Sequence, residues 1–149
     1  DWITQACQDV EIQRWTLVPS PYSRRHAEEF VVQARSQTAH FAVIDRETDL
    51  GVGMIGIHSI DQATGEANAG YWVAPWARRR GVATQALLQL VQHARTLEKA
   101  KSLTLKISPV NFASRETAAK CGFVVVRTEA QSCHDGDTTT DGLIYSLTL

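Results

Sequence analysis

The sequence predicts an α+β fold built on a mostly antiparallel sheet. Three observations predict it: β-branched runs separated by polar turns, segments of helical period between those runs, and the absence of any linker, repeat or low-complexity tract. A chain of this length buries about 68–70% of its unfolded surface, enough for a core without disulfide staples. We therefore expect one domain over residues 1–149.

The first third of the chain is expected to change from helices to strands. Residues 1–16 have the composition of one or two short helical turns. The breaks at Pro19–Pro21 are followed by a helical pattern over residues 23–37. The β-branched runs 41–45 and 50–61, with a polar turn between them, then predict an antiparallel hairpin.

The rest of the chain is expected to alternate between strands and helices. The clearest helix begins near Gly81, because apolar residues then recur every three or four positions. A second helix is expected over 111–121, with Asn111 as its N-cap and Gly122 as its C-cap. Residues 131–141 are expected to form a polar loop. The predicted strands are 67–74, 102–107, 123–130 and 143–149.

Composition argues against several classes of function. The net charge is −1, so neither nucleic acid nor an anionic membrane surface is expected as a partner. No apolar run approaches the ~20 residues that span a bilayer. Three cysteines without CxxC spacing argue against a disulfide framework and a zinc site, so no metal is expected. We expect Cys121 to be a small buried apolar residue, and the protein to be cytoplasmic.

Residues 51–56 match the GxGxxG fingerprint of dinucleotide-binding folds, but their context is wrong for it. The fingerprint requires glycines that end a strand and open a helix. Here the glycines alternate with Val52 and Ile55, which predicts a strand, and no helical pattern follows. Trp76 stands near the position where the fingerprint needs an acid. Glycines in a strand rather mark a bulge or a close approach of the backbone.

The segment 73–84 has the context that residues 51–56 lack: a strand ended by Pro75, a short loop and a strongly periodic helix. The first N–H groups of such a helix have no internal partner, and with the helix dipole they form an anion site. Gly81 allows close approach of the backbone to a phosphate group, and arginines pair well with phosphate. The alternative is a solvated charge cluster. The candidate binding residues are Arg78, Arg79, Arg80, Gly81, Val82, Ala83 and Thr84.

These residues carry a resemblance to a known family. RRRGVA fits the (Gln/Arg)-x-x-Gly-x-(Gly/Ala) signature of the GNAT acyltransferases, and the preceding Val73-x-Pro75 resembles the end of their central strand. The segment NFASRETAAKCGF is similar to the family's Asn-x-x-Ser…Lys-x-Gly-Phe segment. The segments EIQRW…PSPYSRRHAEEF and DGLIYSLTL resemble one branch, the ribosomal-protein N-terminal (alanine/serine) acetyltransferases. The match covers nearly the whole chain in order.

The resemblance implies the GNAT fold, with a sheet that splays at the acetyl-CoA site and about four flanking helices. Acetyl-CoA would be the co-substrate, with its pyrophosphate on residues 78–84 and its pantetheine along Trp72 and Val73. Asn111 would touch the pantetheine, alongside or instead of capping a helix. Family members usually begin with a further strand, which this sequence lacks. This predicts a trimmed or incomplete N-terminus, or a sheet edge covered in another way.

The resemblance further implies an N-acetyltransferase that moves the acetyl group directly to a primary amine. An N-terminal α-amine of a peptide or protein is the expected acceptor. A small-molecule amine (an aminoglycoside or a polyamine) and a CoA-binding module without catalysis are the alternatives. Trp15 and Tyr22 are expected at the acceptor groove, unless they are core residues. The expected partners are acetyl-CoA and the amine, and a homodimer is left open.

The proton for the departing thiolate requires a donor. Many relatives use a Tyr four residues before the Gly of their Gly-Phe pair, and in this sequence that position is Ala118. The branch resembled here carries a Ser at the position of Ser114. We predict that Ser114 donates or relays the proton, with simple capping of a helical turn as the alternative.

The sequence leaves several candidates for the general base. Relatives often carry a Glu on the central strand where this chain has Asn68. Glu66 lies two residues earlier, on the same face of the strand, and is a candidate by that proximity. His58 has the more suitable unperturbed pKa, and Glu129 and Asp135 are further candidates.

Overall fold

The N-terminal part of the protein is helical, as expected. The structure is a computed structural model that describes residues 1–34 and 39–149. Its first helices are α1 (Trp2–Ala6), α2 (Val10–Trp15) and α3 (Arg24–Ala34). Asp9 is the N-cap of α2, because its side chain accepts hydrogen bonds from the backbone N–H groups of Glu11 and Ile12. The end of the helix predicted over 23–37 lies outside the described residues.

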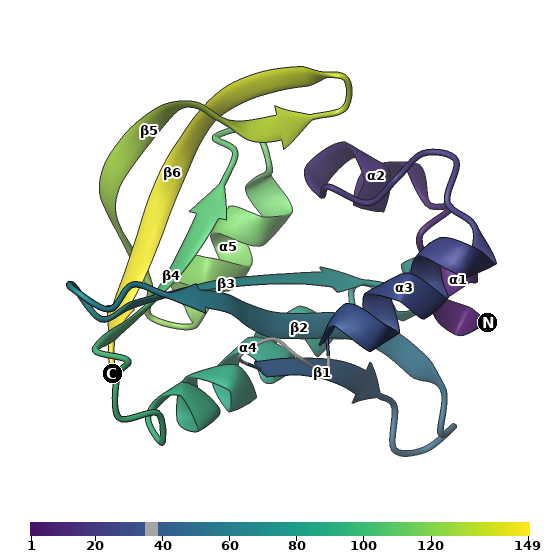
Figure 1. Ribbon diagram of the computed structural model, residues 1–149, viewed down its shortest axis with the longest axis horizontal. Helices are drawn as coiled ribbons and strands as arrows, with labels where there is room; N and C mark the ends of the chain where they lie inside the picture. The colour runs from purple at the N-terminus through teal and green to yellow at the C-terminus, as the bar shows by residue number, and fades with distance from the viewer. Residues whose placement is uncertain (35–38) are drawn as a thin grey trace.

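The described residues form a six-stranded sheet in the order β1-β2-β3-β4-β6-β5 (Figure 1). Neighbouring strands are antiparallel except β3 and β4, which are parallel. The prediction of an α+β fold with a mostly antiparallel sheet is confirmed. The strands are β1 (Ala39–Ile44), β2 (Gly51–Ile60), β3 (Glu66–Val73), β4 (Ser102–Ile107), β5 (Val124–Asp135) and β6 (Thr138–Thr148).

The sheet splays in its middle, as expected. The parallel ladder pairs Glu66–Ala69 of β3 with Ser102–Leu105 of β4 and then stops. Both strands continue beyond it, β3 as far as Val73 and β4 as far as Ile107. The main-chain groups of residues 70–73 that face β4 are therefore left outside the ladder, and an opening separates the ends of the two strands.

Helices cover both faces of the sheet. After a short 3₁₀ turn, η1 (Pro75–Ala77), α4 (Val82–Ala94) packs on β2 and β3, and α5 (Phe112–Lys120) packs on β4 (Figure 1). The main core lies on this side and includes the fully buried Leu87. On the other face α1–α3 enclose a smaller core with Cys7 and Ile12. The described residues thus hold five α-helices where about four were expected, since residues 1–16 form two short helices.

The prediction of a polar loop over residues 131–141 is wrong. β5 runs to Asp135 and β6 begins at Thr138, so the two strands form a long hairpin with a two-residue turn. Gly136 has a φ of +61° and makes this tight turn possible. The register shifts between Glu129 and Cys133, where Gln131 has a φ of +48°. This irregularity interrupts the alternation by which a strand is recognised, and the polar threonines after Gly136 obscured the second strand.

Candidate active site

A cavity of about 1240 Å³ surrounds the opening between β3 and β4. Its walls come from α2, α3, β2, β3, the start of α4, the end of β4 and α5, so it reaches both faces of the sheet. The predicted site residues outside its lining are Glu66, Arg80 and the further candidate bases Glu129 and Asp135. Those that line it are Trp15, Tyr22, His58, Trp72, Val73, Arg78, Arg79, Gly81, Val82, Ala83, Thr84, Asn111 and Ser114.

The start of α4 has the geometry of an anion site. Gly81 is its N-cap with a φ of +75°, and the first intrahelical bond runs from the Gln85 N–H to the Gly81 carbonyl, 3.0 Å away. The N–H groups of residues 82–84 precede this bond and have no partner within the helix. A Cβ added at Gly81 would meet nothing within 4 Å, so the backbone here faces open space. A phosphate group can approach these N–H groups directly.

The three arginines before α4 differ in their surroundings. Arg78 donates to both carboxylate oxygens of Asp9, at 2.5 and 3.2 Å, and Arg80 donates to Asp45 at 2.7 Å. Arg79 is exposed and has no carboxylate partner among the described residues. These ion pairs tie the loop before α4 to Asp9 at the start of α2 and to Asp45 just after β1. Of the three arginines, Arg79 is the one whose charge is left uncompensated at the cavity.

Two histidines face each other on the side of the sheet that carries α3. Nε2 of His40 lies 3.2 Å from Nδ1 of His58. His58 is the extra residue of a β-bulge, because the β2–β3 register shifts between Ile57 and Ser59. The bulge presents its side chain to the cavity at the level of Gly70.

Two glycines provide the space for these imidazoles. Gly56 of β2 and Gly70 of β3 are directly opposite each other in the ladder. A Cβ on Gly70 would lie 2.6 Å from Nε2 of His58, and one on Gly56 would lie 2.7 Å from the ring of His40. Gly70 is also the first residue of β3 beyond the β3–β4 ladder, so Nε2 of His58 lies where the opening begins.

The environment of the pair favours neutral imidazoles. Desolvation lowers the pKa of His58, and the neighbouring His40 lowers it further. Desolvation also lowers the pKa of His40. Nδ1 of His40 is buried and has no hydrogen-bond partner among the described residues. A neutral imidazole can accept a proton, so this pair can act as a base at neutral pH.

A hydroxyl pair occupies the opposite side of β3. Oγ of Ser114 lies 2.9 Å from the phenol oxygen of Tyr71. Asn111 caps α5 by accepting from the Ser114 N–H at 3.1 Å, and it also lines the cavity, so both expected roles of Asn111 are compatible. Ala118 is fully buried and supplies no hydroxyl. Sequence reasoning missed Tyr71, although the period of two places it on the core face with Ala69.

The family model for the GNAT acetyltransferase domain matches residues 1–124 of this chain. The chain belongs to this family. Over 75 residues it is 31% identical to p20, an uncharacterized N-acetyltransferase of Bacillus licheniformis, an alignment that spans 50% of this chain and 42% of that relative. The chain thus spans less than half the length of that curated relative.

Solved structures share the fold of this GNAT domain. A Vibrio cholerae protein named as a ribosomal-protein-serine acetyltransferase superposes with a TM-score of 0.83 at 23% identity, over 99% of this chain and 86% of that one. RimL, a ribosomal α-N-protein acetyltransferase in complex with coenzyme A, gives 0.84 at 17% identity, over 99% and 87%. These similarities confirm the GNAT fold predicted for the chain.

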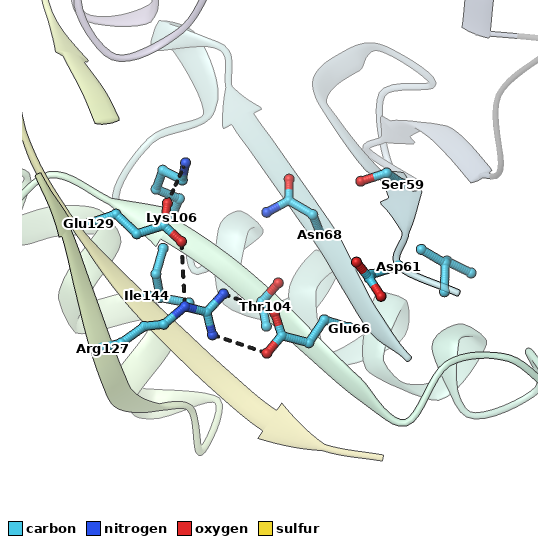
Figure 2. A pocket seen from close by; sticks show the side chains of 10 residues that line it. Ser59, Asp61, Glu66, Asn68, Thr104, Lys106, Arg127, Glu129 and Ile144 are labelled. Carbon is cyan, nitrogen blue, oxygen red and sulfur yellow. Dashed lines mark hydrogen bonds and ion pairs between the residues drawn. The ribbon is translucent and has the colours of Figure 1, made fainter. Parts of the chain in front are cut away.

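The candidate carboxylate bases of the GNAT domain are all held in ion pairs. Arg127 donates to both oxygens of Glu66, at 3.0 and 2.9 Å, in a smaller pocket of about 350 Å³ (Figure 2). Glu129 lies between Arg127 and Lys106 in the same pocket. Asp135 accepts from Arg14 at 2.5 Å. The pairing partners of Glu66 and Asp135 are far away in sequence, so no local pattern could have indicated them.

The expected acceptor residues lie together beside the N-terminal helices. Trp15 lines the cavity, and its ring N–H donates to Glu11 at 2.9 Å. Tyr22 also lines the cavity but is only 6% exposed and belongs to the smaller core. The tip of the β5–β6 hairpin lies across from α2, where the Gly136 N–H donates to the Arg14 carbonyl at 3.0 Å (Figure 1).

Two properties of the described residues concern partners other than a small molecule. Among residues 1–34 and 39–149 no three His, Cys, Asp or Glu side chains are placed to share a metal ion. In the same part of the GNAT domain no helix is both long and apolar enough to cross a bilayer.

All three cysteines are free and buried, which agrees with an apolar role for Cys121.

The ion pair between Asp9 and Arg78 allows a test of how the loop before α4 is held in place. Burial raises the pKa of Asp9, but hydrogen bonds from Arg78 and from two backbone N–H groups lower it more, so the net pKa lies below 3.8. A lowered carboxyl pKa stabilises the folded state above the unfolded pKa, and this contribution is lost as the pH falls through the folded pKa.

Asp9→Asn keeps a helix-capping residue but removes the charge. We expect the variant to lose about 1–2 kcal/mol of unfolding free energy at pH 7. The difference from the wild type should shrink as the pH falls below about 3.8 and disappear only below the folded pKa of Asp9, where the carboxyl is protonated in both states. Urea unfolding at several pH values measures it, with Asp1→Asn, which breaks an exposed pair with Arg24, as the control. An equal loss at low pH would contradict the role of the charge.

Proposed function

We propose that this GNAT domain is an N-acetyltransferase that moves an acetyl group from acetyl-CoA directly to a primary amine. The observation that carries the proposal is the arrangement around β3. An imidazole base lies over Gly70 on one face of the strand, and the Ser114 hydroxyl lies by Tyr71 on the other. Both border the opening after Ala69, so a base and a proton donor lie on either side of the same opening.

The residues around the start of α4 fit the diphosphate of acetyl-CoA. The free N–H groups of residues 82–84, the open space at Gly81 and the uncompensated Arg79 form its binding site. Trp72 and Val73 lie beyond the ladder, and their main-chain groups bond the pantetheine, whose end Asn111 contacts. When bound, acetyl-CoA supplies the activated acetyl group. A backbone N–H of the Val73 end of β3 holds the oxyanion.

His58 is the base in this proposal. It lies in the cavity, its pKa is lowered, and its Nδ1 is held by His40 so that Nε2 is directed to Gly70. Glu66 lies outside the cavity and both its oxygens accept from Arg127. Removing Glu66 from that pair would leave a charge without its partner, whereas His58 needs no rearrangement to receive a proton.

A base of low pKa suits an amine of low pKa. An α-amine is about 10% neutral at pH 7, whereas a lysine amine is only about 0.04% neutral. This difference amounts to about 3 kcal/mol that a lysine acceptor would require from the enzyme. Desolvation weakens His58 as a base, so the site favours an acceptor that is already partly neutral.

The acceptor side of the cavity is apolar and aromatic rather than acidic. Trp15, Tyr22 and Phe30 line it. The two carboxylates among the described residues on this side are both paired with arginines, Glu11 with Arg14 at 3.9 Å and Glu29 with Arg25 at 2.8 Å. A polycation such as a polyamine or an aminoglycoside would need free negative charge here. We therefore propose the N-terminal α-amine of a peptide or protein as the acceptor, in line with the name of the RimL neighbour.

A panel of acceptors tests the proposal by release of free CoA. It contains peptides that begin with Ser, Ala or Met, the same peptides with a blocked N-terminus and one lysine, spermidine and an aminoglycoside. We expect kcat/KM for a free α-amine to exceed that for the lysine at least about 100-fold. A preference for spermidine or the aminoglycoside would contradict the acceptor class. Binding of acetyl-CoA without CoA release from any amine would instead identify a non-catalytic module.

A further inference from the structure

Tyr71 connects the central strand β3 with α5. Its phenol oxygen leaves the strand toward α5 and ends 2.9 Å from Oγ of Ser114. Both residues line the cavity, and Tyr71 packs against the main core with the rest of its ring. The phenol is therefore fixed by packing on one side and meets the candidate proton donor on the other.

We propose that Tyr71 is a positioning residue that directs the hydroxyl of Ser114 toward the sulfur of CoA. This inference rests on the proposed function and deepens it. A serine hydroxyl has one proton and rotates freely. When the Tyr71 O–H donates to Ser114 Oγ, the proton of Ser114 is left to donate elsewhere. The free direction is the cavity, which Ser114 lines.

The proton balance closes without a change of any bond in Tyr71. The amine nitrogen bonds to the acetyl carbon and loses a proton to the base, while the carbon–sulfur bond breaks and its electron pair stays on sulfur. Ser114 gives its proton to that sulfur and takes one back from water, and the base returns its proton to water. Tyr71 keeps its own proton and acts only through the hydrogen bond.

The surroundings of the phenol keep it protonated. Burial raises the pKa of Tyr71 above its ordinary value, and the hydrogen bonds with Ser114 and Thr117 reduce this shift without reversing it. Cys121 is the remaining titratable neighbour, and burial raises its pKa too, so no anion stands beside the phenol at neutral pH. Tyr71 therefore keeps, at neutral pH, the proton with which it can donate to Oγ of Ser114.

The thiol pKa of bound CoA tests the inference without turnover. A donor that bonds the thiolate lowers the pKa of the thiol. The thiolate absorbance of the CoA complex is titrated against the desulfo-CoA complex, which removes the signals of protein tyrosines and cysteines. We expect the thiol pKa to rise by about one unit in Tyr71→Phe and by at least as much in Ser114→Ala. Tyr71→Phe removes a single oxygen and leaves the ring to pack.

Tyr145→Phe is the matched control. Tyr145 is buried, and its phenol also bonds a residue of α5, since it accepts from Arg115 at 3.3 Å. It lies outside the cavity lining, so its variant should leave the thiol pKa unchanged. An equal thiol pKa in Tyr71→Phe and Tyr145→Phe overturns the inference.

A double-mutant cycle in turnover gives the second measurement. We expect Tyr71→Phe to lower kcat about tenfold with little change in KM for acetyl-CoA, and to have no further effect in a Ser114→Ala background. Losses that multiply in the double variant overturn the inference. If the wild type acetylates no amine, the proposed function fails, and the thiol titration alone then decides the role of Tyr71. If CoA does not bind, both fail.

Discussion

Replacing His58 by glutamine is expected to lower kcat/KM for the amine about 100-fold, the lower end of what a general base contributes. Glutamine fills a similar space over Gly70 but cannot accept the proton. The effect is expected to be large because none of the candidate carboxylates is free to replace His58 as the base. The carboxylates of Glu66, Glu129 and Asp135 are held by arginine or lysine side chains.

The pH profile distinguishes this role from a structural one. A base acts in its neutral form, so kcat/KM, calculated on the concentration of neutral amine, rises with pH through the pKa of His58. Because desolvation and His40 lower that pKa, the rise should lie below pH 6.5, and His58→Gln should lack it. His93→Gln is the control, since His93 packs on the ring of Phe41 outside the cavity. A His58→Gln profile that keeps this acid limb would identify another base.

Replacing Gly81 by glutamate is expected to weaken acetyl-CoA binding at least about 100-fold, or about 2.7 kcal/mol. The new carboxylate would lie at the first N–H groups of α4, where it competes with the diphosphate and repels it. Isothermal titration with acetyl-CoA measures the change in Kd. The loss should be visible even if catalysis is not, because it concerns binding alone.

Gly136→Glu is the control for strain and charge. Both glycines have positive φ, +75° at Gly81 and +61° at Gly136, and at neither would a new Cβ meet another atom within 4 Å. Glutamate at either position therefore strains the backbone in the same way and adds the same charge. Only Gly81 lies at the cavity. Equal losses of acetyl-CoA affinity in both variants would place the diphosphate away from α4.

The parts of the fold that follow from local sequence were predicted well. Pro75 ends β3, Gly81 begins α4, and residues 51–56 form a strand rather than a dinucleotide loop. In each case the deciding residues are neighbours in sequence. The strands over 123–130 and 143–149 were predicted, but their extension into the β5–β6 hairpin was not, because the positive φ of Gln131 and the shifted register there depend on pairing between strands.

The sequence indicates candidate site residues where they are consecutive, as in residues 78–84, which line the cavity except for Arg80. It does not indicate candidates that depend on contacts between distant segments. Tyr71 and Ser114 lie 43 positions apart, and Glu66 and Arg127 lie 61 apart. Such contacts determine whether a carboxylate is free and whether a hydroxyl is oriented. Those properties become visible only when the strands are placed.

In the proposed mechanism, Gly56 of β2 and Gly70 of β3, which face each other in the ladder, must lack side chains. A methyl group at Gly70 would displace the imidazole of His58, and one at Gly56 would displace that of His40, although neither glycine itself reacts. Gly56 is also the last residue of the segment that imitates a nucleotide-binding fingerprint. In the folded protein, the last glycine of this GxGxxG motif therefore leaves room for the ring of His40.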